Sequence, residues 1–168
     1  KSGDSGKMSR YELRQAIQGA DRQDLLAFNA ALNWYTTGMR SIFLQDANSL
    51  IVKPGELIRV LEHLQKRFGD VERIISYALL YTIDRIKDAD LVTMRTRGLN
   101  RIHIGLESGS DDVLKRVHKG ATKEMHVKAG LKVIKAGMEL SEYVMPGLGG
   151  RELSQKHALE TADALNQI

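Results

Sequence analysis

The chain has 168 residues, of which 42% are hydrophobic, so it can bury one sizeable core without needing a disulfide or a metal. Its net charge is +4, its basic residues are spread along helical segments, and only 5% of residues are aromatic, so the composition argues against nucleic-acid binding. There is no cysteine, which excludes thiolate catalysis, disulfides and cysteine-ligated metal clusters from these residues.

Residues 1–9 are polar and aperiodic, which indicates a flexible N-terminus before a single core domain over residues 10–168. No apolar run approaches the ~18 residues that a membrane span needs, and no secretory signal is evident. We therefore expect a cytoplasmic protein. From about Tyr11 the pattern turns helical and stops at Gly38, and residues 40–44 read as a short strand.

A second unit begins at Pro54, which opens a helix with one apolar face that ends at Gly69. Residues 73–78 form the next predicted strand. A weaker helical pattern covers about residues 83–97, and a third strand follows over residues 101–106.

Ser110 is predicted to cap the next helix, because the two aspartates that follow it place negative charge in the first turn. A break at Lys119–Gly120 separates this helix from a longer one that begins near Thr122 and stops at Gly137. Residues 138–145 form the fourth strand, and a last helix occupies residues 151 onward.

The alternation of strands with crossover helices predicts an α/β fold with a parallel sheet and right-handed connections. We expect a partial TIM-like (βα)n barrel with about four strands and five helical segments, although a flat doubly wound sheet fits the pattern as well. Four strands cannot close an eight-stranded barrel. Because the chain opens on a helix, a first strand is expected to lie outside it.

Polar or glycine-rich residues follow every strand, and in parallel sheets such exits share one edge, where ligands bind. Alternation in the third strand places His103, Gly105 and Glu107 on one face. Glu107 can accept hydrogen bonds from a sugar diol or an amino group, or serve only as a capping or salt-bridged carboxylate. Asp46 and Asn48 can hold an ammonium group or simply form a turn.

The remaining polar residues carry weaker signals. Residues 146–150 are rich in glycine and would let a flat ring approach the backbone, but they do not form a phosphate-binding loop. The histidines lack the spacing of a helical zinc site. Ser108 lacks the upstream glycine of a nucleophile elbow, so a hydrolase is disfavoured.

Taken together, residues 40–168 resemble the radical S-adenosylmethionine (radical SAM) superfamily, in particular the branch with the oxygen-independent coproporphyrinogen oxidases and the methylthiotransferases. The strongest likeness is Gly105-Leu-Glu-Ser-Gly-Ser-Asp-Asp-Val-Leu-Lys-Arg116 with Lys119-Gly120. The second is Tyr143-Val-Met-Pro-Gly-Leu-Gly-Gly150, followed by a helix with His157.

The resemblance implies a role for each strand exit. The turn containing Gln45, Asp46 and Asn48 corresponds to the family's glycine-glycine-glutamate turn, which binds the amino group of S-adenosylmethionine, with Asn48 where the glutamate would stand. Ser76, Glu107 and Ser108 would contact the ribose or the methionine carboxylate. Residues 145–147, with Met145 and Gly147, would border the adenine.

The family's Cys-x-x-x-Cys-x-x-Cys loop, which ligates a 4Fe–4S cluster, is absent from this sequence. We therefore expect a fragment of a longer enzyme in which S-adenosylmethionine and the cluster generate a 5′-deoxyadenosyl radical, with an electron donor and an unknown, small-molecule or other, substrate as partners. One alternative is a noncatalytic binding or scaffold domain that kept the fold. Another is a different β/α enzyme that uses Glu107 or Asp46 as an acid or base.

Overall fold

The computed structural model describes residues 11–12, 15, 17–19, 21–45 and 47–168. The expectation of a flexible segment over residues 1–9 lies outside these residues. The chain divides into two compact units, Lys1–Arg40 and Ser41–Ile168. In the part of the chain that is described, none of the helices combines the length and the apolar character needed to cross a bilayer.

In the first unit, helix α2 spans Arg22–Thr36. A turn at residues 17–19 interrupts the helical region expected from Tyr11. The side chain of Asp21 starts the helix, because its Oδ1 accepts hydrogen bonds from the backbone N–H groups of Gln23 and Asp24, at 2.8 and 2.9 Å. None of the residues of α2 is buried.

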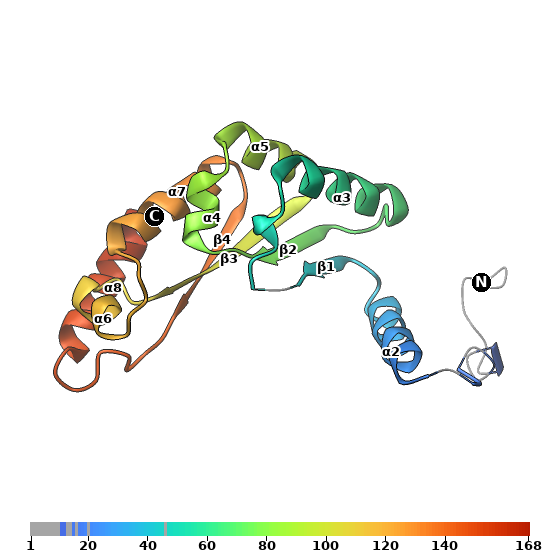
Figure 1. Ribbon diagram of the computed structural model, residues 1–168, viewed down its shortest axis with the longest axis horizontal. Helices are drawn as coiled ribbons and strands as arrows, with labels where there is room; N and C mark the ends of the chain where they lie inside the picture. Colours follow the sequence, from blue (N-terminus) through green and yellow to red (C-terminus); the bar gives the residue numbers. More distant parts are fainter. Residues whose placement is uncertain (1–10, 13–14, 16, 20, 46) are drawn as a thin grey trace. The chain divides into compact units, whose positions relative to one another are not determined.

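The second unit is built on a four-stranded sheet of β1 (Ser41–Leu44), β2 (Arg73–Tyr77), β3 (Leu99–Glu107) and β4 (Glu139–Val144). Every pairing is parallel, and the strands lie in the order β1-β2-β3-β4 (Figure 1). The predicted parallel α/β fold is confirmed. Over the described residues the sheet is open, as a partial barrel requires.

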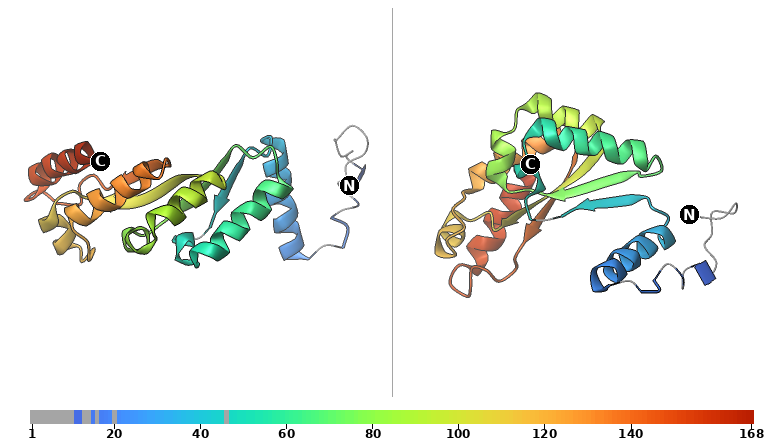
Figure 2. Two further views of the ribbon diagram at one scale, coloured as in Figure 1. Left: turned by 90° about the horizontal axis from the view of Figure 1, so that it is seen from above. Right: turned by 45° about the vertical axis from the view of Figure 1, so that its right-hand side comes forward.

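The helices of this unit are α3 (Pro54–Arg67), α4 (Leu80–Arg85), α5 (Asp88–Thr96), α6 (Asp111–Arg116), α7 (Lys123–Lys135) and α8 (Ser154–Gln167), with a 3-10 turn η1 (Ser49–Ile51). Helices α3, α5 and α7 follow one another along one side of the sheet (Figure 2). The five predicted segments thus contain seven α-helices in the described chain. The break at Lys119–Gly120 was predicted, whereas a second one at Ile86 was not.

The unpredicted break between α4 and α5 comes from tertiary packing. Ile86 and Lys87 both adopt extended backbone, and the Ile86 side chain lies in the core. The ammonium group of Lys132 donates hydrogen bonds to the carbonyl oxygens of Asp84 and Ile86, which would otherwise lack partners at the end of α4. The helical periodicity of residues 83–97 is therefore overridden by contacts that are distant in sequence.

The core lies between the sheet and the helices that cover it. In β3, Ile102, Ile104 and Leu106 are fully buried, while the alternate residues His103 and Glu107 are only partly buried. The alternation predicted for this strand is confirmed. One face of the sheet is thus committed to packing, and the other is left to form a site.

Candidate ligand site at the strand exits

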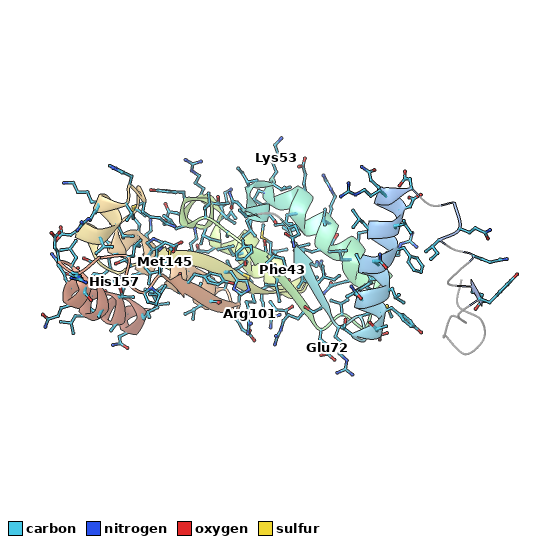
Figure 3. All side chains as sticks on the ribbon, turned by 90° about the horizontal axis from the view of Figure 1, so that it is seen from below. Phe43, Lys53, Glu72, Arg101, Met145 and His157 are labelled. Carbon is cyan, nitrogen blue, oxygen red and sulfur yellow. The ribbon has the colours of Figure 1, made fainter. Side chains whose placement is uncertain are left out.

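A row of aromatic rings crosses the sheet on the face opposite the helices. Phe43, Tyr77, His103 and Tyr143 each come from a different strand, and the centroids of neighbouring rings are 5.0, 5.3 and 5.6 Å apart. The hydroxyl groups of Tyr77 and Tyr143 lie 3.3 Å apart. Phe43, which Figure 3 labels, lies on the edge strand β1 at one end of this row. The row therefore forms a continuous aromatic floor.

The floor is uncharged near neutral pH. Burial, assisted by the charge of Arg101, lowers the pKa of His103, so its ring is neutral. The hydrogen bond with Tyr77 raises the pKa of Tyr143. The Nδ1 atom of His103 is buried and has no hydrogen-bond partner among the described residues. A flat ligand would meet π faces here together with a few polar atoms.

A cavity of about 450 Å³ lies over this floor at the carboxyl ends of the strands. Its wall includes Gln45 after β1, Tyr77 at the end of β2, Glu107 at the end of β3, and Lys119. This volume falls in the range of small-molecule sites, which usually combine apolar walls with a few polar groups. The exits of β1, β2 and β3 thus line one cavity, as expected, whereas the glycine-rich exit of β4 does not.

Glu107 has an unusual backbone conformation at this wall. Its φ is +62°, in the left-handed region, and the β3–β4 register shifts between Gly105 and Glu107. The Glu107 Oε1 atom lies 3.2 Å from the Lys119 ammonium nitrogen, and both side chains are largely buried. A Cβ on Gly105 would stand 2.6 Å from that oxygen, so the glycine leaves room for the carboxylate. Such strained backbone persists only where surrounding structure holds it, and it clusters at functional sites.

The turn after β3 is fastened to α8 by a cluster that we call the clasp, made of Ser108, Gly109, His157 and Thr161. The Ser108 Oγ lies 2.8 Å from the His157 Nδ1, and the Gly109 N–H donates to the Thr161 Oγ1 at 2.9 Å. All three side chains of the clasp are buried. The hydroxyl of Ser108 is therefore directed at α8 and not into the cavity.

Other residues nominated from the sequence have structural partners. The side chain of Asn48 donates to Thr82 and accepts from the backbone N–H of Leu79, so it fixes the turn after β2. Ser76 is fully buried and donates to the carbonyl of Tyr77. Asp46 lies outside the described residues. Three residues of the turn after β1 were predicted to bind the ligand, and of the two that are described, Gln45 lines the cavity whereas Asn48 does not.

The turn after β4 lies beside a second cavity. Gly147 lines a groove of about 560 Å³ along α8, which His157 also borders. The Met145 side chain is half exposed, and its backbone N–H donates to the carbonyl of Glu107 at 2.9 Å. Met145 therefore contacts the Glu107 turn through its backbone, whereas Pro146 and Gly147 line a different cavity.

Sequence reasoning missed several side chains at this site. Tyr77 and His103 stand at paired positions of β2 and β3, whereas Tyr143 pairs with Gly105, two residues further along β3, so the strand register was needed to bring the three rings together. Lys119 stood in the motif with Gly120, but nothing in the spacing showed that it pairs with Glu107. The sequence pattern shows only that His157 lacks the spacing of a zinc ligand. His157 is structural, since it is 6% exposed.

Two further ionisable side chains near the site have buried polar atoms and no side-chain hydrogen-bond partner in the described structure, namely His126 on α7 and Glu142 on β4. Burial lowers the pKa of His126 to about 4, and the Lys119 charge adds to the effect. Burial raises the pKa of Glu142 to about 8, and the nearby Leu106 N–H and Lys119 offset this only in part. Both groups are therefore neutral at pH 7.

The model of the radical SAM superfamily matches residues 31–162. The chain belongs to the radical SAM superfamily. A comparison with curated protein sequences gave no match. The resemblance seen in the Gly105 and Tyr143 motifs is thereby confirmed.

Solved structures of radical SAM proteins share the fold. The cobalamin-dependent S-adenosylmethionine radical enzyme OxsB, with aqua-cobalamin bound, is 24% identical with a TM-score of 0.59, over 91% of this chain and 21% of OxsB. Coproporphyrinogen III oxidase (HemN) from Escherichia coli is 15% identical with a TM-score of 0.50, over 62% of this chain and 24% of HemN. This radical SAM chain therefore spans less than a quarter of the length of either enzyme.

The residues of this chain do not fit the iron–sulfur cluster of the family. The sequence has no cysteine, and the described residues contain no group of three or more His, Cys, Asp or Glu side chains placed to hold a metal. No chemical step through a cluster is therefore derived from these residues. The cavity, in contrast, has the size and the polar groups to hold a nucleoside-like ligand.

Proposed function

We propose that this chain is the part of a radical SAM enzyme that binds S-adenosylmethionine, in the cavity over the aromatic floor. The observation that carries the proposal is the Glu107–Lys119 pair at the cavity wall, at 3.2 Å and largely buried. The left-handed backbone conformation of Glu107 costs free energy, and such strain clusters at functional sites. This favours a binding role for the Glu107 carboxylate over a purely structural one. The family match supports the choice of ligand.

In this proposal the two charged groups divide the polar contacts with the ligand. The Glu107 carboxylate accepts hydrogen bonds from the ribose hydroxyl groups, since its two oxygens suit a diol. The Lys119 ammonium group attracts the methionine carboxylate. Gln45 would hydrogen-bond the amino acid end of the ligand. The adenine would extend out of this cavity, past the Glu107 turn, toward Met145 and Gly147, where a Cβ on Gly147 would meet nothing within 4 Å.

S-adenosylmethionine, with a reduced 4Fe–4S cluster, supplies a 5′-deoxyadenosyl radical in this family. We propose that residues outside these 168 supply the cluster ligands, in a cytoplasmic enzyme that takes electrons from a donor and acts on a substrate not yet identified. The role of this chain is then to orient the ligand and exclude water from it.

A noncatalytic binding or scaffold domain is the second candidate. The absence of cysteine from the sequence is the observation that favours it. It predicts a full-length protein that binds S-adenosylmethionine, or another ligand, in the same cavity without ever forming a cluster. Anaerobic reconstitution of the full-length protein with iron and sulfide separates the two candidates. Absorbance at ~400 nm from a 4Fe–4S cluster is expected only for the radical SAM enzyme.

The binding proposal is tested by calorimetric titration of the full-length protein with S-adenosylmethionine. Glu107→Gln keeps the shape of the side chain and removes its charge, so we expect the affinity to fall about tenfold, as for the loss of one charge-assisted hydrogen bond. Glu62→Gln, which breaks the exposed pair with Arg97 on the helical layer, is the matched control. Equal affinities for Glu107→Gln and the control would refute the proposed site.

A further inference from the structure

We infer that His157 is a positioning residue of the binding site, which acts through the clasp to hold Glu107 in its ligand-binding conformation. The inference rests on the proposed function. His157 does not line the 450 Å³ cavity, and it reaches Glu107 only through Ser108. The clasp, the turn around Glu107 and the glycines beside them carry the argument.

The hydrogen bonds of Ser108 define the role that we assign to His157. The Ser108 Oγ accepts the backbone N–H of Ser110 at 3.0 Å. Its own hydrogen is thus free to be donated, and the nearest acceptor is the Nδ1 atom of His157 at 2.8 Å. We assign the Ser108 hydroxyl as the donor, so that Nδ1 of His157 accepts and the ring proton lies on Nε2. His157 therefore acts as an acceptor that orients the Ser108 hydroxyl.

The rest of the clasp prevents the turn from moving away from α8. The Gly109 N–H donates to the Thr161 Oγ1. A Cβ on Gly109 would lie 2.3 Å from the carbonyl oxygen of Glu160 and 2.7 Å from the Thr161 Cα, so the turn already touches the helix backbone. Position 109 therefore needs a glycine because the turn approaches the backbone of α8 closely, and not because of a positive φ.

The clasp acts directly on the strained residue. The Ser108 N–H donates to the Leu106 carbonyl at 2.7 Å, which closes a three-residue turn with Glu107 at its centre and φ at +62°. Turns of this kind with positive φ are rare and strained. The Glu107 carbonyl is held on its other side by the Met145 N–H. Releasing Ser108 would let Glu107 relax to an ordinary φ and withdraw from Lys119.

His157 also contacts the second glycine-rich turn. A Cβ on Gly149 would stand 3.2 Å from the His157 Cβ and 2.9 Å from the Leu153 carbonyl oxygen. The turns after β3 and β4 therefore pack against the same side chain. Through Ser108 and Gly149, a single buried residue sets the relative position of both ligand-binding turns.

The test compares His157→Asn with His157→Leu in the full-length protein. Asparagine can place its Oδ1 where the Nδ1 of histidine stands, whereas leucine fills the volume without an acceptor. We expect S-adenosylmethionine affinity to fall at least about tenfold in His157→Leu and less than about threefold in His157→Asn. Lys156→Ala, the exposed neighbour on α8, should bind like the wild type.

If the two His157 variants melt at comparable temperatures, the difference between their affinities comes from positioning. A purely structural role for His157 would lower the affinity of both variants by the same factor. Unchanged affinity in His157→Leu overturns the inference, and so does an equal loss in both variants. If His157→Leu does not fold, Thr161→Val replaces it, since it removes the acceptor of the Gly109 N–H at constant shape. Wild-type affinity in Thr161→Val would also overturn the inference.

Failure of the proposed function has a different signature. In that case the wild type does not bind S-adenosylmethionine, and the clasp is judged by amide hydrogen exchange. The N–H groups of Gly109 and Ser110 should exchange faster in His157→Leu than in His157→Asn, because the hydroxyl of Ser108 loses its fixed orientation. Equal exchange rates would overturn the role of His157 whatever the ligand is.

Discussion

Replacing Gly109 with alanine tests the packing of the β3 turn against α8 most directly. The added Cβ would stand 2.3 Å from the Glu160 carbonyl oxygen, 2.7 Å from the Thr161 Cα and 2.8 Å from the Ala164 Cβ. Two of these three atoms belong to the helix backbone, so no side-chain rotation relieves the overlap. Either α8 or the turn would have to move by about 1 Å, well beyond what close-packed interiors absorb freely.

Overpacking of this kind lowers the free energy of unfolding by about 1–3 kcal/mol. Because the neighbours of the added Cβ are rigid backbone atoms, we expect Gly109→Ala to lie at the upper end, at ~3 kcal/mol. In a chain of 168 residues, each kcal/mol corresponds to about 2–4 °C in melting temperature. We therefore expect a decrease of roughly 6–12 °C, measured by circular dichroism during heating and confirmed by urea unfolding.

The matched control is Gly55→Ala in the first turn of α3. A Cβ there would meet nothing within 4 Å and no positive φ is required, so alanine should be neutral or stabilising by up to ~1 kcal/mol. A melting temperature for Gly109→Ala within about 2 °C of the wild type would refute the close approach of the turn to α8.

Three further predictions concern charged side chains. Glu142, whose pKa is raised to about 8, takes up a proton on folding, so the free energy of unfolding should fall as the pH rises from the ordinary value of 4.5 to about 8. Between pH 4.5 and 6.5 the lowered pKa of His126 opposes this fall. We therefore expect a net loss of ~1–3 kcal/mol between pH 6.5 and 8 in urea titrations, and Glu142→Gln should abolish it. Lys132→Met should cost ~1–2 kcal/mol in the same assay, because two carbonyls at the end of α4 lose their donor, and an unchanged midpoint would contradict this capping role. Lys156→Ala, which breaks the exposed pair with Asp112, should leave the urea unfolding midpoint unchanged, and a lower midpoint would mean that α8 depends on this pair.

The parts of the fold that follow local rules could be predicted from the sequence. The alternation of Ile102 and Ile104 with His103 showed which face of β3 is buried, and the position of Glu107 at the strand end placed it at the site. The strands begin and end within two residues of the predicted bounds for the same reason, since turn residues and apolar runs act over short distances.

The parts that depend on distant partners could not be predicted. Nothing near Ile86 signals a break, because the group that stabilises it is Lys132 on α7. Ser108 was nominated as a ligand contact, and its buried bond with His157 joins residues 49 positions apart. The left-handed φ of Glu107 is equally invisible, because it depends on how that turn is held and not on residue type.

The clasp also has a consequence for the order in which the protein acquires its structure. Its hydrogen bonds join residues 49 and 52 positions apart, and both partners on the far side lie in α8, the last helix. Contacts of such long separation form late, after the local helices and neighbouring strands. On the ribosome, where the chain emerges from its N-terminus, β3 would be complete well before the helix that shapes its exit. The turn around Glu107 thus takes its final shape only when α8 docks, so binding of the proposed ligand would report on the docking of α8.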